Sequence, residues 1–273
     1  MFWKRFKRNK SAILGLVICI LLLFIAIFSP LISPYDPYEQ NLIEKLQSPN
    51  SNHKLGTDAY GRDMLSRIFY GAGITFLAGF LVIILALLIG TTLGVVSGYW
   101  GGLFDTIIMR SMDFLLAFPY FFLAILIVAI LGPSLTNAII AITIGSIPQF
   151  ARVVRSTTLG LKELPYIEAS KAMGSSDIRI MWEHIIPNLI GPIIVLGTVG
   201  IAQSIIQVAT LSFLGMGAQP PIAEWGLMLS EGRNYIFSHP HLTMVPGIFL
   251  SILVLSINLI GDGLRDTLDP RLK

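Results

Sequence analysis

Residues 11–35 read SAILGLVICILLLFIAIFSPLISPY, and this stretch contains no Asp, Glu, Lys or Arg. A helix needs about 20 predominantly apolar residues to cross the hydrocarbon core of a bilayer, and this stretch is long enough. Four more charge-free stretches follow, at 68–104, 114–149, 185–223 and 234–261. The whole chain is 54% hydrophobic and only 13% charged, whereas about 25% is usual in soluble domains. The sequence therefore predicts an all-α, polytopic membrane protein.

The stretch at 114–149 is long enough for two spans, because Leu131-Gly132-Pro133-Ser134 interrupts it. Six transmembrane helices are therefore expected, at about 12–32, 74–97, 114–131, 136–156, 189–211 and 243–261. A central Lys or Arg costs roughly 2.5–3.5 kcal/mol on insertion scales, which explains why the spans lack charge. The basic start followed by an apolar run is similar to a signal peptide. The run is too long, however, and no small-x-small cleavage site follows it, so an uncleaved first span is expected.

Lys and Arg are unequally distributed between the two sides of the membrane. If the N-terminus is cytoplasmic, 14 of the 19 face the cytoplasm, and five lie outside: Lys45, Lys54, Arg62, Arg67 and Arg233. Cytoplasmic loops carry the excess of Lys and Arg in membrane proteins. Both termini are therefore expected to be cytoplasmic. The net charge of +3 reflects this bias. The lipid bilayer is an expected partner, and no nucleic acid partner is expected.

Two kinds of energy-coupling chemistry are absent from the sequence. No Asp, Glu, Lys or His stands in the middle of an expected span, although ion-coupled transporters usually need such groups. The chain also has no Gly-Lys dipeptide and hence no phosphate-binding loop of the type G-x-x-x-x-G-K-[ST]. Uphill transport would therefore take its energy from another chain, with an ion-coupled secondary transporter as the weaker alternative. We expect no enzyme activity and no bound cofactor or metal; His239-Pro240-His241 is interpreted as a solvated loop.

The internal segment at about 157–188 has the pattern of two short helices that meet at a sharp corner. Pro165 suits a first helical turn, and Gly174 stands where a helix C-terminus needs a left-handed residue. Pro187 is expected to end the second helix before the fifth span. An apolar stripe at i, i+3, i+4, i+7 spacing consists of Ile178, Met181, Trp182 and Ile185. Such a corner could dock into a partner, or it could be an amphipathic helix at the membrane surface.

Three motifs follow one another in this segment: Glu168-Ala169-Ser170, Gly174 and His184-Ile185-Ile186-Pro187. Together they resemble the EAA loop of type I ATP-binding-cassette import permeases. Ser170 stands where the general pattern has a second Ala, and His184 stands where Ile is frequent. The ending with His184 is similar to the peptide and nickel branch of that family.

Other stretches resemble the same branch in order and spacing. Residues 55–63 are similar to its external segment after the first span, 211–226 to its loop after the fifth span, and 261–270 to its cytoplasmic tail. The resemblance points to the C-type permease subunit of dipeptide, oligopeptide or nickel importers, in the cytoplasmic membrane of a bacterium or archaeon. The expected division is a start with the first helix and an external segment (1–70), a transmembrane domain (71–262) and a tail (263–273).

The resemblance implies a type I importer permease fold and several partners. A second related permease would complete the translocation path, two ATPase subunits would bind ATP and Mg²⁺, and an extracytoplasmic substrate-binding protein would deliver the solute. Peptides are the favoured substrate class, with nickel or a metal chelate as the alternative. The residues that would contact the ATPases are Glu168, Ala169, Ser170, Gly174 and Pro187.

Two further sets of residues have alternative interpretations. Five external residues form either an ordering network or a platform for the binding protein, and structural order is the favoured interpretation: Asp58, Arg62, Asp63, Glu224 and Trp225. Three glycines share one face of the second span: Gly90, Gly94 and Gly98. This small-xxx-small spacing indicates a tight seam, within the bundle or with the partner permease, unless it only reflects how frequent Gly is in membrane helices.

Overall fold

The computed structural model describes residues 6, 7 and 9–268, and this part of the chain is helical apart from loops and an isolated β-bridge between Thr57 and Asp63. The long helices are α2 (Lys10–Ile32), α3 (Met64–Trp100), α6 (Leu135–Lys162), α9 (Ile186–Phe213) and α11 (His241–Leu268). The shorter ones are α4 (Gly102–Leu116), α5 (Tyr120–Leu131), α7 (Pro165–Ala172), α8 (Asp177–Ile180) and α10 (Trp225–Gly232), with a π turn at Met181–Ile185 and 3-10 turns at Leu42–Glu44 and Arg233–Tyr235. Outside the described residues lie the basic positions 4, 5, 8, 271 and 273 and the end of the expected tail.

Within the described residues, five helices are long and apolar enough to cross a membrane: α2, α3, α6, α11 and the continuous run Asp177–Phe213. The pair of α4 and α5 makes a sixth span if the two are counted together. The expected six spans are thus present in this sense. Their ends differ from the prediction, since α3 begins at Met64, so the expected boundary at residue 70 falls inside this helix.

The expected continuous span over 114–131 is wrong, because α4 and α5 are bent by 90° at a short break. Pro119 stands directly before α5; it has no N–H to donate and disfavours a helical conformation at Phe118. The two carboxylates of α4 form ion pairs with α6. Asp105 accepts hydrogen bonds of 2.5 and 2.6 Å from Arg155, and Asp113 accepts one of 2.6 Å from Arg152.

The glycine face of α3 packs against α6. An ideal β-carbon on Gly90 would lie 2.6 Å from the β-carbon of Phe150, and one on Gly98 would lie 2.9 Å from the carbonyl oxygen of Arg155. Gly94, between them, comes equally close to the α6 backbone. Such distances leave no room for a side chain, so the seam lies within the bundle.

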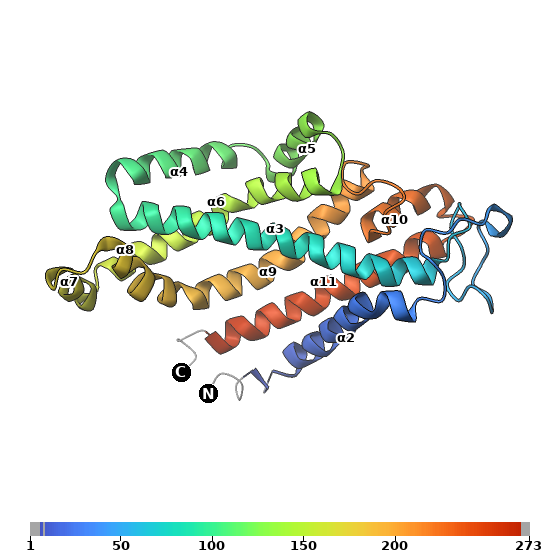
Figure 1. Cartoon of the computed structure of the whole chain (residues 1–273), viewed down its shortest axis with the longest axis horizontal. Coiled ribbons are helices and arrows are strands. Elements are labelled where there is room, and N and C mark those ends of the chain that lie inside the picture. Colours follow the sequence, from blue (N-terminus) through green and yellow to red (C-terminus); the bar gives the residue numbers. More distant parts are fainter. Residues whose placement is uncertain (1–5, 8, 269–273) are drawn as a thin grey trace.

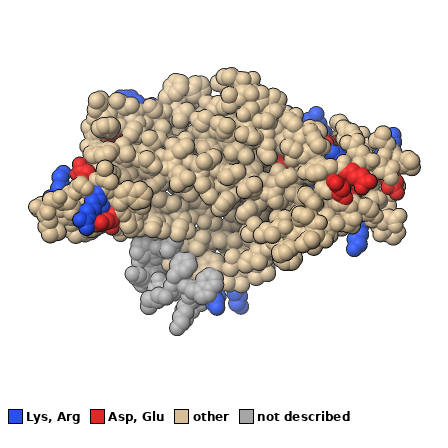
Figure 2. Space-filling model, in the orientation of Figure 1, with Lys and Arg blue, Asp and Glu red and all other residues tan. Residues whose placement is uncertain are grey.

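The helices lie roughly along one long axis, with the loops that the sequence predicts to be external at one end and α7 and α8 at the other (Figure 1). The start of α2 and the end of α11 lie side by side, where the Asn9 amide donates to Asp266 over 3.1 Å. Both lie nearer the end of the bundle that carries α7 and α8 than the opposite end (Figure 1). On the face shown in Figure 2, charged side chains gather toward the two ends and the broad middle carries almost none. This distribution is typical of a bundle that spans a bilayer.

Candidate functional site

The segment between α6 and α9 forms the helical corner that the sequence predicts. Gly174 follows α7 with φ +85°, in the left-handed region. Its N–H donates to the carbonyl of Lys171 over 3.0 Å, and the N–H of Ser175 donates to the carbonyl of Ser170 over 3.1 Å. These two hydrogen bonds make a Schellman motif. Ser176 then caps α8 by accepting from the N–H of Arg179. The chain therefore turns sharply with its backbone groups satisfied.

Side chains fasten the two arms of the corner to each other. The Ser170 hydroxyl lies 3.3 Å from Nε2 of His184, and the ring of Tyr166 packs edge-on against His184 with centroids 5.9 Å apart. Ser170 and His184 are the two positions at which this sequence departs from the general loop pattern, and here they meet. Their contact explains why a hydroxyl and an imidazole can stand together in place of two apolar side chains.

The corner is also anchored to the bundle. The Tyr99 hydroxyl at the end of α3 donates to Asp177 at the start of α8 over 2.7 Å. Met181 and Ile185 are buried against Val95 and Val154 of the bundle. The predicted apolar stripe is thus divided: these two residues face inward, while Ile178 and Trp182 remain exposed.

Pro187 does not end the helix, contrary to the prediction. The chain passes from α8 through the π turn Met181–Ile185 directly into α9, and Pro187 lies in the first turn of α9. A π turn is wider than an α turn, which relieves the clash between a proline ring and the carbonyl four residues earlier. The Asn188 side chain donates to the carbonyl of His184 over 2.6 Å. One continuous helical rod therefore joins the corner to the membrane bundle.

The outer surface of the corner is partly apolar. Met173 is 80% exposed and Trp182 is 66% exposed, and Trp182 borders an apolar groove together with Leu88 and Thr92 of α3. Glu168 and Ala169 of α7 are exposed as well. Large exposed apolar side chains on a water-facing surface mark an interaction site. Of the predicted coupling residues, Glu168, Ala169 and Gly174 are thus exposed on this corner, which we call the knob, whereas Ser170 is buried inside it and Pro187 lies in the first turn of α9.

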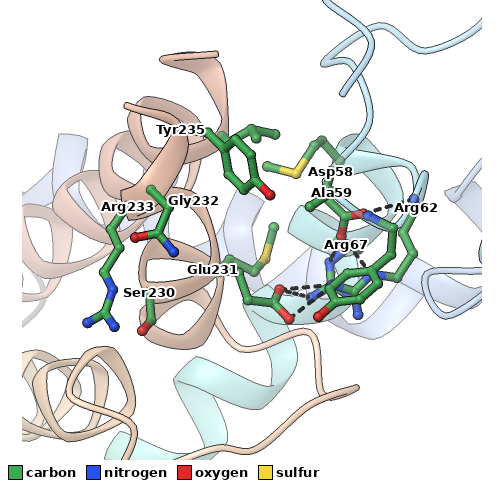
Figure 3. Close-up of a pocket in the computed structure, with 14 residues that line it drawn as sticks. Asp58, Ala59, Arg62, Arg67, Ser230, Glu231, Gly232, Arg233 and Tyr235 are labelled. Atoms are coloured by element: carbon green, nitrogen blue, oxygen red, sulfur yellow. Dashed lines mark hydrogen bonds and ion pairs between the residues drawn. The ribbon is translucent and has the colours of Figure 1, made fainter. Parts of the chain in front are cut away.

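At the opposite end, buried ion pairs hold the external segment to α10. Nε of Arg62 donates to Asp58 over 2.6 Å, and its Nη2 donates to Glu231 over 2.9 and 3.0 Å. Nη2 of Arg67 donates to the same carboxylate over 2.9 Å. Figure 3 shows the Glu231 carboxylate facing both guanidinium groups, beside a cavity of about 220 Å³. Sequence reasoning missed this role of Arg67 and Glu231, because no local pattern joins residues so far apart in the chain.

The other three external candidates are also buried and have partners within the chain. Asp63 caps α3 by accepting from the N–H of Ser66 over 2.8 Å, and Glu224 caps α10 in the same way. Nε1 of Trp225 donates to the carbonyl of Ile68 over 3.1 Å. Burial raises the pKa of the Glu224 carboxyl, although the backbone N–H groups at the start of α10 partly offset this shift. These contacts support the interpretation as structural order, and docking through these residues stays a prediction.

Comparison with known proteins identifies the family. Residues 90–273 match the model of the binding-protein-dependent transport system inner membrane component, and residues 1–49 match the N-terminal transmembrane domain of oligopeptide transport permease C. The chain belongs to this transport permease family. It is therefore a multi-pass permease of the inner membrane, as the resemblance implied.

Relatives of this permease match it over nearly its whole length. It is 48% identical to a dipeptide transport system permease protein of Alkalihalophilus pseudofirmus, over 99% of this chain and 89% of the relative. The identity is 46% with the dipeptide permease of Haemophilus influenzae, over 100% and 94% of the two chains. It is 45% with a glutathione transport system permease protein of Pectobacterium atrosepticum, over 100% and 91%.

A solved structure confirms the expected fold. The inward-facing methionine ABC transporter MetNI contains a chain that matches this permease with a TM-score of 0.58 at 22% sequence identity. The match covers 75% of this permease and 97% of that chain. The helical bundle with its projecting corner is thus the fold of an ABC importer permease.

Proposed function

We propose that this permease forms, together with a second related permease, the path by which an ATP-driven importer moves dipeptides or oligopeptides across the cytoplasmic membrane. The names of the relatives, which refer to dipeptide and glutathione transport, support the substrate class. In this proposal both termini and the corner face the cytoplasm. ATP and Mg²⁺ bind to separate ATPase subunits, and this chain binds no cofactor.

The exposed knob of α7 and α8 is the observation that carries the proposal. Met173, at the end of α7, offers exposed apolar surface for a groove on an ATPase subunit, and Glu168 is an exposed charged residue of the same helix. Because Gly174 and the Ser170–His184 contact fix the corner, the knob can move as a unit with its partner. A loose loop could not transmit such a movement.

The route from the knob into the membrane is the unbroken rod of α8, the π turn and α9. α9 packs against α3, α6 and α11. A displacement of the knob on ATP binding therefore tilts or shifts α9 relative to these neighbours. We infer that this coupled movement opens the path alternately to the two sides of the membrane.

On the external side, a substrate-binding protein docks on a surface that the buried ion pairs keep in place. Arg62 and Arg67 are buried and the Glu231 side chain is only 18% exposed, so these residues act by ordering the loops. Ile43 and Phe237 are exposed apolar side chains of the two external segments, and they supply contact surface for this partner.

Growth of an auxotroph tests the proposed function. In a strain that cannot make one amino acid, deletion of this permease should stop growth on a dipeptide that contains that amino acid, while growth on the free amino acid continues. The variant Met173→Glu should be produced and inserted normally, but it should lose the ATPase subunits during purification. Unchanged growth of the deletion strain on every dipeptide tested would refute the peptide assignment.

A further inference from the structure

Two glutamine side chains in the middle of membrane-spanning helices are exposed on the surface of the chain. Gln149 lies near the centre of α6, and Gln203 lies in the central part of α9. Within the part of the chain that the structure describes, neither side-chain amide has a hydrogen-bond partner. Both are uncharged, so a search for charged residues inside the spans does not detect them.

The two glutamines lie at the same depth of the bundle. The Tyr120 hydroxyl lies 3.1 Å from the Ser146 hydroxyl of α6 and donates to Gln207 of α9 over 2.7 Å. A β-carbon on Gly200 would lie 3.4 Å from the ring of Phe150. Residue numbers thus rise along α6 as they fall along α9, which makes the helices antiparallel. Gln149 is one turn beyond Ser146, and Gln203 is one turn before Gln207, so the two amides share a level.

The polar face continues toward the corner end of the bundle. Arg152, one turn beyond Gln149 on α6, forms an ion pair with Asp113 of α4 over 2.6 Å, and half of each side chain is exposed. We call the residues Ser146, Gln149, Arg152, Gln203 and Gln207 the polar stripe. Other exposed side chains in the middle of the spans are apolar, such as Leu21 in the centre of α2, or are hydroxyls such as Ser251 of α11 that bond a carbonyl of their own helix.

Lipid is an unsuitable neighbour for the polar stripe. Hydrocarbon offers no donor or acceptor, so a primary amide exposed to it keeps its hydrogen-bonding groups unsatisfied. The half-exposed ion pair of Arg152 and Asp113 on the same face also needs polar neighbours, which hydrocarbon cannot supply. Polar groups at membrane depth are found where they face water or protein. The stripe therefore marks the side of α6 and α9 that is turned away from lipid.

We propose that the polar stripe lines the water-filled path, and that Gln149 and Gln203 hydrogen-bond the backbone of the passing peptide; this assignment rests on the proposed function. A primary amide has both donors and an acceptor, as a peptide bond does, so each glutamine can pair with a peptide group. Such hydrogen bonds do not depend on which side chains the peptide carries. They suit a path that must accept peptides of different sequence and release them again.

Cysteine accessibility in the assembled transporter tests the proposal. Cys19 is the only cysteine and is buried, so Cys19→Ser gives a parent without thiols. Gln149→Cys and Gln203→Cys are introduced singly, with Leu21→Cys as the matched control because Leu21 is 55% exposed at the centre of α2. A charged, membrane-impermeant thiol reagent should modify the two path variants at least about tenfold faster than the control, since thiol reactivity follows access to water. A saturating dipeptide, delivered with the binding protein, should slow this modification.

Two results would overturn the assignment. Equal rates for Gln149→Cys, Gln203→Cys and the Leu21→Cys control would place the stripe against lipid or a partner helix. Fast modification that the dipeptide does not slow would mean that the stripe faces water but does not bind peptide. Uptake of labelled dipeptide by the Cys19→Ser parent separates this failure from that of the proposed function. A parent that transports peptide but shows either result refutes the stripe alone, whereas a wild-type transporter without uptake refutes the peptide function and the stripe's role with it.

Substitutions provide a second, independent readout. Gln203→Met and Gln149→Met keep the approximate shape of the side chain and remove its hydrogen bonds. Each should lower uptake of neutral, acidic and basic dipeptides by the same factor, because the lost contacts are to the backbone. A loss confined to one class of side chain would contradict recognition of the peptide backbone.

Discussion

A β-carbon built on Gly94 of α3 would lie 2.6 Å from the carbonyl oxygen of Ala151 on α6. The two helices thus touch through backbone atoms, which cannot move aside as a flexible side chain can. Gly94→Ala should force the helices apart and lower the free energy of unfolding by about 1–3 kcal/mol, the usual cost of overpacking. Thermal unfolding of the purified permease in detergent measures this effect.

Gly160 provides the matched control for this seam. It lies on α6, the partner helix of the seam, but a β-carbon there would have no atom within 4 Å. Both substitutions gain the helix propensity of Ala, worth up to about 1 kcal/mol, so their difference isolates the contact with α6. Gly160→Ala should leave the melting temperature unchanged or raise it. Equal shifts for the two variants would show that the seam tolerates a methyl group.

The left-handed conformation of Gly174 predicts a different outcome. Its φ is +85°, and a β-carbon there would meet nothing within 4 Å. Gly174→Val therefore destabilises the turn by about 1–2 kcal/mol through backbone strain alone. This destabilisation is confined to the corner between α7 and α8. Membrane insertion and melting temperature of the bundle should change little, while peptide uptake and recovery of the ATPase subunits should fall.

Asparagine at this position separates backbone geometry from side-chain bulk. Asn adopts the left-handed conformation more readily than other residues with a side chain. Gly174→Asn should therefore retain most of the uptake that Gly174→Val loses. If both variants lost uptake equally, the side chain itself, rather than the turn, would be disturbing the docked partner.

The spans were predictable because the solvent dictates them. Charge-free stretches of the right length mark where a helix meets hydrocarbon, and five of the six expected stretches are single helices. Helix ends were less predictable, since a helix can continue into water. α3 begins at Met64, within a polar segment, because its first turn is held by Asp63 and by the ion pair of Arg67.

Prolines were harder to interpret than charges. Pro119 breaks the third expected span, whereas Pro187 is accommodated in a continuous rod. The difference depends on the backbone around each residue. A π turn precedes Pro187, and no local sequence pattern predicts this turn. The corner was predictable, because Gly174 and the capping Ser176 are local signals. Its fastening through Ser170 and His184 was not, since the contact needs both arms in place.

The external candidates show the limit of motif reasoning. Asp58 and Arg62 are near each other in sequence, but their common partner Glu231 lies in a distant segment. Only the folded chain shows that these groups are buried. Gln149 and Gln203 were missed for another reason, since they carry no charge and lie in stretches without Asp, Glu, Lys or Arg.

The shared carboxylate of Glu231 leads to a third prediction. It neutralises Arg62 and Arg67, whose side chains are 1% and 0% exposed. Glu231→Met would leave two buried guanidinium groups with Asp58 alone. Removal of one partner from a buried ion pair costs about 3–5 kcal/mol, so the melting temperature should fall strongly and the external segment should become sensitive to protease. Glu183→Met, which breaks the exposed pair with Arg179, should cost only about 0.3–0.5 kcal/mol.

A double variant tests whether an uncompensated buried charge causes the loss of stability in Glu231→Met. In Glu231→Met combined with Arg67→Met, Arg62 keeps Asp58 as a partner and the pair is balanced. This double variant should be more stable than Glu231→Met alone, because coupled residues do not contribute additively. A double variant less stable than the single one would instead mean that packing of the Arg67 side chain dominates.

Glu224 gives a prediction for the dependence of stability on pH. Burial raises the pKa of its carboxyl above the ordinary value of 4.5, and the N–H groups of Gly226 and Leu227 only partly offset this shift. In the unfolded chain the group returns to its ordinary pKa. Between the two values the folded state holds a proton that the unfolded state has released. Stability from this group is therefore complete below pH 4.5 and is lost as pH rises through the raised value.

Glu224→Gln isolates this contribution, because Gln resembles the protonated carboxyl and does not titrate. The melting temperature of the wild type minus that of the variant, measured between about pH 4 and 8, should fall as pH rises and then level off. Each unit of pKa shift corresponds to about 1.4 kcal/mol. All other titrating groups are common to the two proteins and cancel in the difference. A difference that grows with pH would mean that the N–H groups at the start of α10 outweigh burial and that Glu224 is held ionised.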